Sequence, residues 1–140
     1  MNNAHFKLEC FKNGLYSPEQ VIGFYNTIYK GNTKFNKRDA QLWMNGKSWG
    51  IYVIDQTAIE MINMLNKIRA ELIADEKKRI EKNKPRYTKM FKAEVDLWEF
   101  HKELINLPLN FFHSILIEMN IFEVEYYGNL SILEDEKNEY

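Results

Sequence analysis

Residues 41–54 read QLWMNGKSWGIYVI, and this stretch decides the predicted fold. Asn45-Gly46 at its centre is a strong signal for a two-residue type I′ turn, because both central residues of that turn need a positive φ. We therefore expect a β-hairpin whose side chains alternate between two faces. Trp43 and Tyr52 fall on the outer face, where they are available to a partner unless a second layer of the chain covers them. The opposite face is assigned to the core and carries Leu42, Met44, Trp49, Ile51 and Val53.

Four further segments have the apolar periodicity of helices. They cover residues 17–31, a stretch from 55 or 57 to 83, residues 87–106 and residues 109–119. The first has the clearest ends, since Ser17 can act as the N-cap, Gln20 can complete a capping box and Gly31 can end the helix. In the second, Ile80 is the only apolar residue after Ala74, so its last turns should project into water.

Strands are predicted at both ends of the chain. Residues 5–11 alternate, with Phe6, Leu8 and Cys10 on one face. Near the C-terminus, residues 122–126 and 130–133 flank Gly128-Asn129, which suits a type II′ turn. The resulting order, β-α-β-β-α-α-α-β-β, predicts an α+β fold in which antiparallel hairpins or a small sheet pack against a layer of three to four helices. We expect a single domain over residues 1–134 and a flexible acidic tail over 135–140.

The composition is that of a globular chain with enough large side chains for a core. Of 140 residues, 45% are hydrophobic and 28% are charged, which excludes a disordered protein. The single cysteine, Cys10, excludes an internal disulfide and favours a reducing compartment. The first residues lack the pattern of an export signal, and no apolar run approaches the roughly 18 residues that cross a bilayer. A cytoplasmic location without membrane contact is therefore expected.

Motifs for catalysis or cofactor binding do not stand out. Gly46-Lys47-Ser48 matches the end of a phosphate-binding loop, but Gln41 stands where that loop needs its first glycine. None of the three histidines has metal-ligand spacing. His5 and Cys10 would point to opposite faces of a strand, so they cannot form a nucleophile pair. We predict neither a metal, nor a cofactor, nor an enzymatic activity.

Two polar residues interrupt the apolar stripe of the third predicted helix. Glu94 could be a catalytic acid or base, but a carboxylate at such a position more often pairs with a neighbouring Lys or Arg at the edge of the core. His101 is interpreted as a hydrogen-bonded imidazole within the core.

Charge is separated along the chain, although the formal net charge is only −1. Residues 77–92 contain eight basic residues and one acid, whereas residues 118–140 contain seven acids and one base. Blocks of opposite sign favour contact with each other, within one chain or between copies. The basic run is either an anion-binding site or the solvated end of a helix, where cations suit the helix dipole.

A non-catalytic binding protein that acts through a protein–protein interface is the predicted function, for example a small inhibitor of a host enzyme of the kind found on phages and mobile elements. The alternative is a nucleotide or nucleic-acid binder that stacks bases on exposed aromatics and holds phosphates with the basic run. The candidate contact residues are Trp43, Lys47, Tyr52, Lys77, Lys78, Arg79, Lys82, Lys84, Arg86 and Lys89. A homodimer through residues 58–72 or 109–119 is also plausible from their apolar surface.

Overall fold

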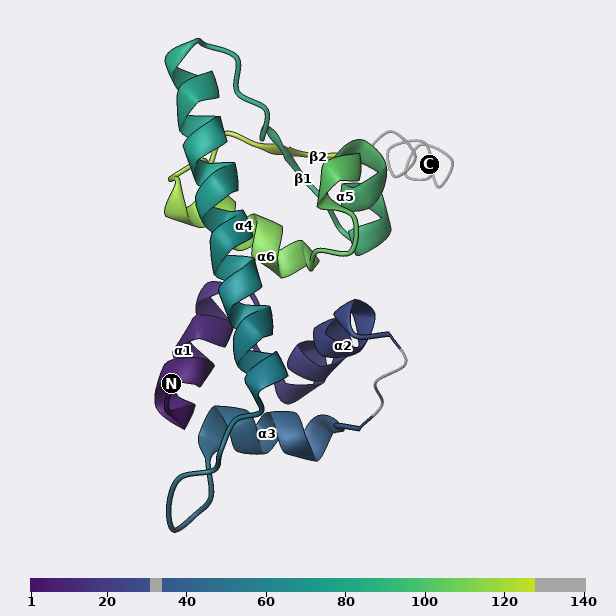
Figure 1. Cartoon of the computed structure of the whole chain (residues 1–140). Helices are drawn as coiled ribbons and strands as arrows, with labels where there is room; N and C mark the ends of the chain where they lie inside the picture. Colours follow the sequence, from purple (N-terminus) through teal and green to yellow (C-terminus); the bar gives the residue numbers. More distant parts are fainter. Residues whose placement is uncertain (31–33, 128–140) are drawn as a thin grey trace, which may run out of the picture.

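The computed structural model describes residues 1–30 and 34–127 (Figure 1). Its elements, in chain order, are α1 (Asn3–Lys12), α2 (Pro18–Ile28), α3 (Lys37–Asn45), α4 (Gln56–Glu81), β1 (Lys89–Met90), α5 (Glu94–Phe100), the short 3₁₀ helix η1 (Lys102–Leu104), α6 (Leu109–Glu118) and β2 (Glu125–Tyr126). The α+β prediction is therefore wrong. Over the described ranges the fold is mainly helical, with a two-stranded parallel sheet in place of antiparallel hairpins on a helical layer.

The longest helix, α4, forms the axis of the molecule. α1, α2 and α3 surround its N-terminal half, whereas α5, α6 and the two strands lie along its C-terminal half (Figure 1). Ala58, Met61 and Leu65 are fully buried, which confirms the apolar stripe that predicted this helix. Asp55 caps the helix by accepting the Thr57 N–H at 3.0 Å. The last turns project past the rest of the molecule, as the sequence predicted.

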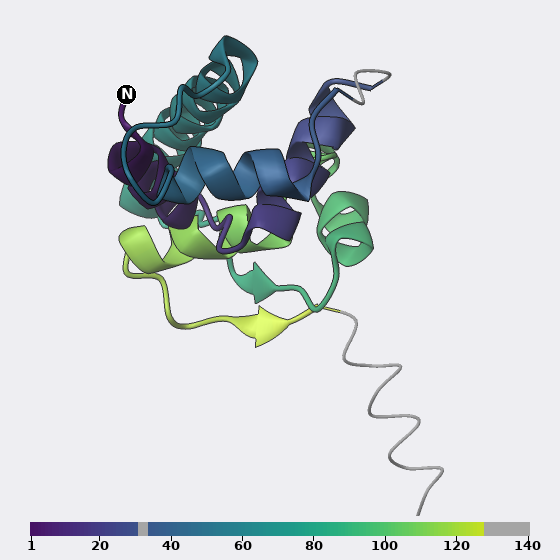
Figure 2. The same ribbon diagram turned by 90° about the horizontal axis from the view of Figure 1, so that it is seen from below.

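Aromatic rings fill the N-terminal half of the core. α3 lies across α1 and α2 when the molecule is seen from below (Figure 2), and it packs against both. The Trp43 ring of α3 lies 6.3 Å from Phe6, 5.8 Å from Tyr25 and 5.1 Å from Phe35, measured between ring centroids. Trp43 thus joins three segments of the chain.

Residues 5–11 belong to α1, so the predicted strand is wrong. Asn2 starts the helix by accepting the His5 N–H at 2.7 Å. Phe6 and Cys10 are buried, and a spacing of four residues puts two side chains on one face of a helix as well as of a strand. Leu8 separates the two interpretations, because it is 66% exposed and so lies off the buried face.

The hairpin predicted at Asn45-Gly46 is also wrong, because the residues before the turn form α3. Asn36 and Asp39 make a capping box: the Asp39 N–H donates to Asn36 Oδ1 at 3.2 Å and the Asn36 N–H donates to Asp39 Oδ2 at 2.7 Å. Gly46 has the positive φ of 71° that the turn signal requires, but here it ends a helix. Trp43 is consequently buried, and Trp49, which was assigned to the core, is exposed.

The single helix predicted over residues 87–106 is wrong, because only α5 (Glu94–Phe100) and the short η1 (Lys102–Leu104) are helical there and residues 87–93 are not. Glu76 Oε1 accepts the backbone N–H of Arg86 at 3.0 Å and that of Tyr87 at 3.3 Å. Because these two backbone N–H groups are bound by a side chain of α4, residues 86 and 87 are held against that helix. The chain then continues through β1 before α5 begins. A contact between residues ten positions apart has no local sequence signal.

The predicted C-terminal hairpin is replaced by a parallel pairing with β1. Lys89 stands opposite Glu125, and Met90 stands opposite Tyr126. The predicted turn and return strand over 128–133 lie outside the described residues, as does the predicted tail over 135–140.

Two predicted helices are confirmed with nearly the expected bounds. Ser17 caps α2 by accepting the Gln20 N–H at 3.2 Å, and the Gln20 side chain accepts the Tyr16 N–H at 2.6 Å. α2 ends at Ile28, and the predicted end at Gly31 lies outside the described residues. α6 covers residues 109–118 and is buried along most of its length, although Ile117 is 63% exposed.

Candidate functional site

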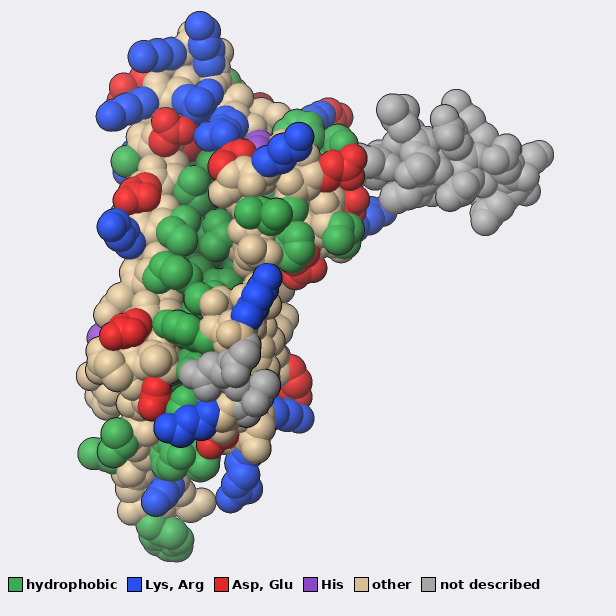
Figure 3. Space-filling model, turned by 45° about the vertical axis from the view of Figure 1, so that its right-hand side comes forward, with side chains coloured by type: hydrophobic (Ala, Val, Ile, Leu, Met, Phe, Trp, Pro, Cys, Tyr) green, Lys and Arg blue, Asp and Glu red, His purple; other side chains and the backbone are tan. Residues whose placement is uncertain are grey.

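The three most exposed large apolar side chains of the described chain lie on one loop. We name residues 46–54, which connect α3 to α4, the apical loop. Trp49 is 99% exposed, Val53 84% and Ile51 78%. The loop extends beyond α3 at the lower end of the molecule (Figure 1), and hydrophobic side chains stand at that end in the space-filling view (Figure 3). Apolar side chains gathered on a protrusion are typical of interaction surfaces, so the apical loop is the candidate functional site.

A tight turn places Trp49 at the tip of the apical loop. The Lys47 N–H donates to the Gly50 carbonyl at 3.2 Å, and the Gly50 N–H donates back to the Lys47 carbonyl at 3.3 Å. Exposure then alternates along residues 51–54, as in an extended chain. Ile54 faces the core, whereas Ile51 and Val53 face solvent.

The base of the apical loop is held by a buried asparagine. The Asn3 side-chain amide donates to the carbonyl of Tyr52 at 2.8 Å and to that of Trp43 at 3.0 Å. Its Oδ1 atom accepts the Tyr52 N–H at 3.1 Å. Asn3 is only 8% exposed, and its amide pairs with Tyr52 as a neighbouring peptide group would. The loop is thus fixed to α1 and α3 by hydrogen bonds sheltered from water.

The aromatic residues that the sequence singled out do not form the predicted outer face. Trp43 is 1% exposed and packs within the core. Tyr52 is half-buried, with the Lys47 ammonium 5.7 Å from its ring centroid. The structure therefore offers no Trp43–Tyr52 platform on which a base could stack. The predicted hairpin placed Trp49, Ile51 and Val53 in the core, and this assignment is wrong because all three side chains are exposed.

The basic run divides into paired and unpaired side chains. Arg79 pairs with Asp75 at 3.0 Å, Arg86 pairs with Asp75 at 3.8 Å and with Glu103, and Lys89 pairs with Glu125. The last pair brings the basic and acidic blocks together within one chain. The remaining candidates are exposed lysines without an ion-pair partner in residues 1–30 and 34–127: Lys77, Lys78, Lys82 and Lys84. Basic side chains cluster at the projecting end of α4 in Figure 3.

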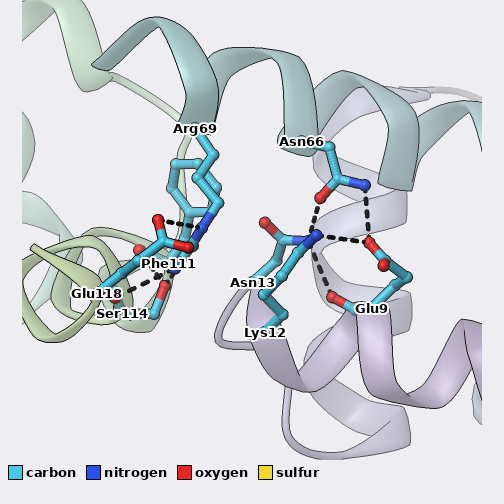
Figure 4. A network of polar contacts seen from close by, with 8 residues as sticks. All are labelled: Glu9, Lys12, Asn13, Asn66, Arg69, Phe111, Ser114 and Glu118. Carbon is cyan, nitrogen blue, oxygen red and sulfur yellow. Dashed lines mark hydrogen bonds and ion pairs between the residues drawn. The ribbon is translucent and has the colours of Figure 1, made fainter. Parts of the chain in front are cut away.

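A polar network crosses the middle of α4 (Figure 4). Arg69 is 6% exposed and reaches α6, donating from Nη1 to Ser114 Oγ at 2.8 Å, with Nε 3.3 Å from a Glu118 carboxylate oxygen. One turn earlier, Asn66 accepts from the Asn13 side-chain amide at 3.0 Å and donates to Glu9 at 2.7 Å. These contacts connect α4 to its neighbours on both sides, so we assign the network a structural role.

His101 lies in an aromatic part of the core, at the end of α5. Its ring centroid lies 4.8 Å from that of Phe100 and 5.3 Å from that of Tyr87, and its Nδ1 atom lies 3.4 Å from a carboxylate oxygen of Glu103. Burial lowers the pKa of His101, and the neighbouring Glu103 carboxylate partly opposes that shift. The predicted core location is confirmed. His101 Nε2 has no hydrogen-bond partner among the residues that the structure describes.

A groove of about 440 Å³ runs between α2 and α5. Gly23 and Phe24 line it from α2, and Val95 and Trp98 line it from α5. Its lining contains no histidine or cysteine, and its one carboxylate, Glu94, is exposed at the first residue of α5. Glu94 makes no ion pair with a described Lys or Arg, contrary to expectation, and accepts the Leu109 N–H at 3.5 Å.

Groups that could support covalent or metal chemistry are dispersed in the described ranges. No three His, Cys, Asp or Glu side chains there gather into a set that could hold a metal ion. Cys10 is buried, and that burial raises the pKa of its thiol to about 12. A thiol held in its protonated form is a poor nucleophile.

None of the described helices is both long and apolar enough to cross a membrane. Comparison with known proteins finds no matching protein family, no matching curated protein and no matching solved structure.

Proposed function

We propose that this chain is a protein-binding module whose contact surface is the apical loop. One observation carries the proposal: Trp49 is 99% exposed on a loop whose base is fixed by the buried Asn3 amide. Tryptophan is among the residues that dominate the binding energy of protein interfaces. A loop that is already ordered loses less conformational entropy on binding than a free one, so more of the contact energy remains as affinity.

The chemistry of the apical loop favours a protein over a nucleic acid. Lys47 is the one charged residue of the apical loop and none occurs from Ser48 to Ile54, so the apolar surface formed by Trp49, Ile51 and Val53 offers phosphates little attraction. Val53 and Ile51 add branched aliphatic side chains, which fill apolar pockets but do not stack on bases. An inhibitor of a host enzyme could act in this way, by placing the loop in an apolar cleft of its target.

The four unpaired lysines at the end of α4 support a second candidate function, the binding of an anionic ligand such as a nucleic acid. Lys77, Lys78, Lys82 and Lys84 are all exposed, so together they present positive charge that no described acid neutralises. Such binding should weaken steeply with salt, because it releases counterions. Fluorescence anisotropy with a labelled oligonucleotide, for the natural chain and for a variant with these lysines changed to Gln, tests it. Equal, salt-independent binding by both proteins would exclude this second function.

Site-specific photocrosslinking in cells tests the first function. Benzoylphenylalanine placed at position 49 should give discrete adducts with whatever protein contacts the apical loop. The same probe at position 8 is the matched control, since Leu8 is also an exposed apolar residue, at 66%, and lies on α1. Adducts at position 49 that are absent at position 8 are the expected result. The same set of adducts at both positions would contradict a contact surface on the loop.

A further inference from the structure

Residues 50–54 of the apical loop form backbone hydrogen bonds along only one of their two edges. In an extended chain, the N–H and C=O groups of successive residues point to opposite sides. Gly50 exchanges two hydrogen bonds with the Lys47 backbone, at 3.2 and 3.3 Å. Tyr52 exchanges two with the Asn3 amide, at 2.8 and 3.1 Å. The backbone groups of Gly50 and Tyr52 are thus satisfied along the same edge.

The other edge of this segment is open. Ile51 and Val53 turn their backbone groups to that side, and no residue in the described part of the chain donates to them or accepts from them. Their side chains are 78% and 84% exposed. Proteins usually protect an open edge with charged side chains or proline, and the segment from Ser48 to Ile54 contains neither.

We propose that this open edge pairs with the same edge of a second copy of the chain, as an antiparallel ribbon centred on Tyr52. The inference deepens the proposed function and rests on it, because it identifies the protein that contacts the apical loop. The pattern is symmetrical about Tyr52, with one open residue on either side. In an antiparallel pair centred there, Ile51 of each copy faces Val53 of the other, and every open N–H meets an open C=O.

The chemistry of the edge matches a second copy in two further respects. The facing side chains are both β-branched, and such cross-strand pairs stabilise antiparallel strands. No like charges face each other across the paired residues, because the segment from Ser48 to Ile54 is uncharged. Pairing along one edge covers only part of the exposed side chains of Trp49, Ile51 and Val53, so the interface is smaller than the roughly 1,200 Å² of stable specific complexes. The dimer should therefore be weak and reversible.

Sedimentation over a micromolar to millimolar concentration series tests the pairing. The natural chain should pass from the mass of one copy to that of two. Val53→Lys should weaken the dimer at least about tenfold, since it places two like charges at the paired edge. Val53 is exposed, so the variant should keep the helical circular dichroism of the natural chain.

Two matched variants show whether any added charge would have the same effect. Leu8→Lys on α1 and Ile117→Lys on α6 replace residues that are 66% and 63% exposed. Both should dimerise like the natural chain. A loss of the dimer in Ile117→Lys but not in Val53→Lys would overturn the pairing in favour of an interface at residues 109–119.

Amide hydrogen exchange gives a second readout that a side-chain contact alone would not change. Protection of the Ile51 and Val53 N–H groups should rise with protein concentration, whereas the Gly50 and Tyr52 groups should be protected at every concentration. A dimer in which all four amides exchange independently of concentration would overturn strand pairing.

Failure of this inference can be told from failure of the proposed function. A natural chain that stays monomeric at all concentrations, but whose position 49 crosslinks to a different protein, overturns the pairing and leaves the binding function standing. A monomer that instead shifts its Trp49 emission to the blue on lipid vesicles, relative to Trp49→Phe, overturns both in favour of a membrane surface. Identical adducts at positions 49 and 8 overturn the contact surface itself.

Discussion

At the scale of single residues, the stability contributed by a tryptophan depends on where its ring lies, and Trp43 and Trp49 occupy opposite extremes. Trp43→Ala removes a ring that contacts Phe6, Tyr25 and Phe35, so it should lower the free energy of unfolding by about 3–5 kcal/mol. Trp49→Ala removes a ring that is 99% exposed and should change it by less than about 0.5 kcal/mol. Urea denaturation followed by circular dichroism measures both. Equal losses in the two variants would contradict the burial of Trp43.

The sequence pattern could not separate these two rings. Residues 42–54 satisfy an alternating pattern, and Asn45-Gly46 suits a hairpin turn as well as the end of a helix. The residues that decide between the two structures lie earlier in the chain: Asn36, which forms the capping box of α3, and Asn3, whose buried amide binds Tyr52. The sequence therefore predicted an exposed aromatic residue in this part of the chain, but the exposed ring is that of Trp49 and Trp43 is buried in α3.

At the scale of elements, the segment from α5 to η1 should make stability depend on pH. Burial lowers the pKa of His101 below that of an exposed imidazole, so the folded chain holds this imidazole neutral where the unfolded chain protonates it. The unfolded state then binds more protons, and the free energy of unfolding falls as the pH drops below about 6.5. His113 has its pKa lowered by burial as well and adds to the same slope.

Denaturation at a series of pH values between about 5 and 8 measures this slope. His101→Phe keeps an aromatic ring beside Tyr87 and Phe100, and it should flatten the dependence without removing the part due to His113. His5→Phe is the control, because the His5 side chain is 55% exposed on α1. If the free energy of unfolding of His101→Phe depended on pH as steeply as that of the natural chain, the His101 imidazole would not contribute to the pH dependence.

The elements that the sequence predicted well are those whose signals lie within or directly beside their own residues. α2 has Ser17 and Pro18 at its start, and α4 repeats apolar residues over several turns. The break in the helix predicted over residues 87–106 depends instead on Glu76, a residue of α4 that binds two backbone N–H groups of the returning chain. The pairing of β1 with β2 likewise joins residues that are far apart in the sequence.

At the scale of the whole molecule, α4 is shared by both halves, and the halves also touch directly. Asn66 reaches the end of α1 and Arg69 reaches α6, one helical turn apart (Figure 4). Gly14 follows α1 and packs against the start of α6 so closely that a Cβ atom would lie 2.3 Å from the Asn110 carbonyl carbon. We therefore expect one cooperative unfolding transition, with Trp43 and Trp98 reporting the same midpoint from the two halves.

Two glycines test this contact between the halves. Gly14 has a φ of 79° and no room for a side chain, so Gly14→Ala should lower the free energy of unfolding by at least about 2 kcal/mol. Gly23 lies inside α2 and has no atom within 4 Å of its would-be Cβ, so Gly23→Ala should raise it by about 0.5–1 kcal/mol through helix propensity alone. The free energy of unfolding of each variant is measured by urea denaturation, in which Trp43 and Trp98 are followed as separate probes. If Gly14→Ala shifted the Trp43 transition and left that of Trp98 in place, the two halves would unfold independently and the shared axis would not couple them.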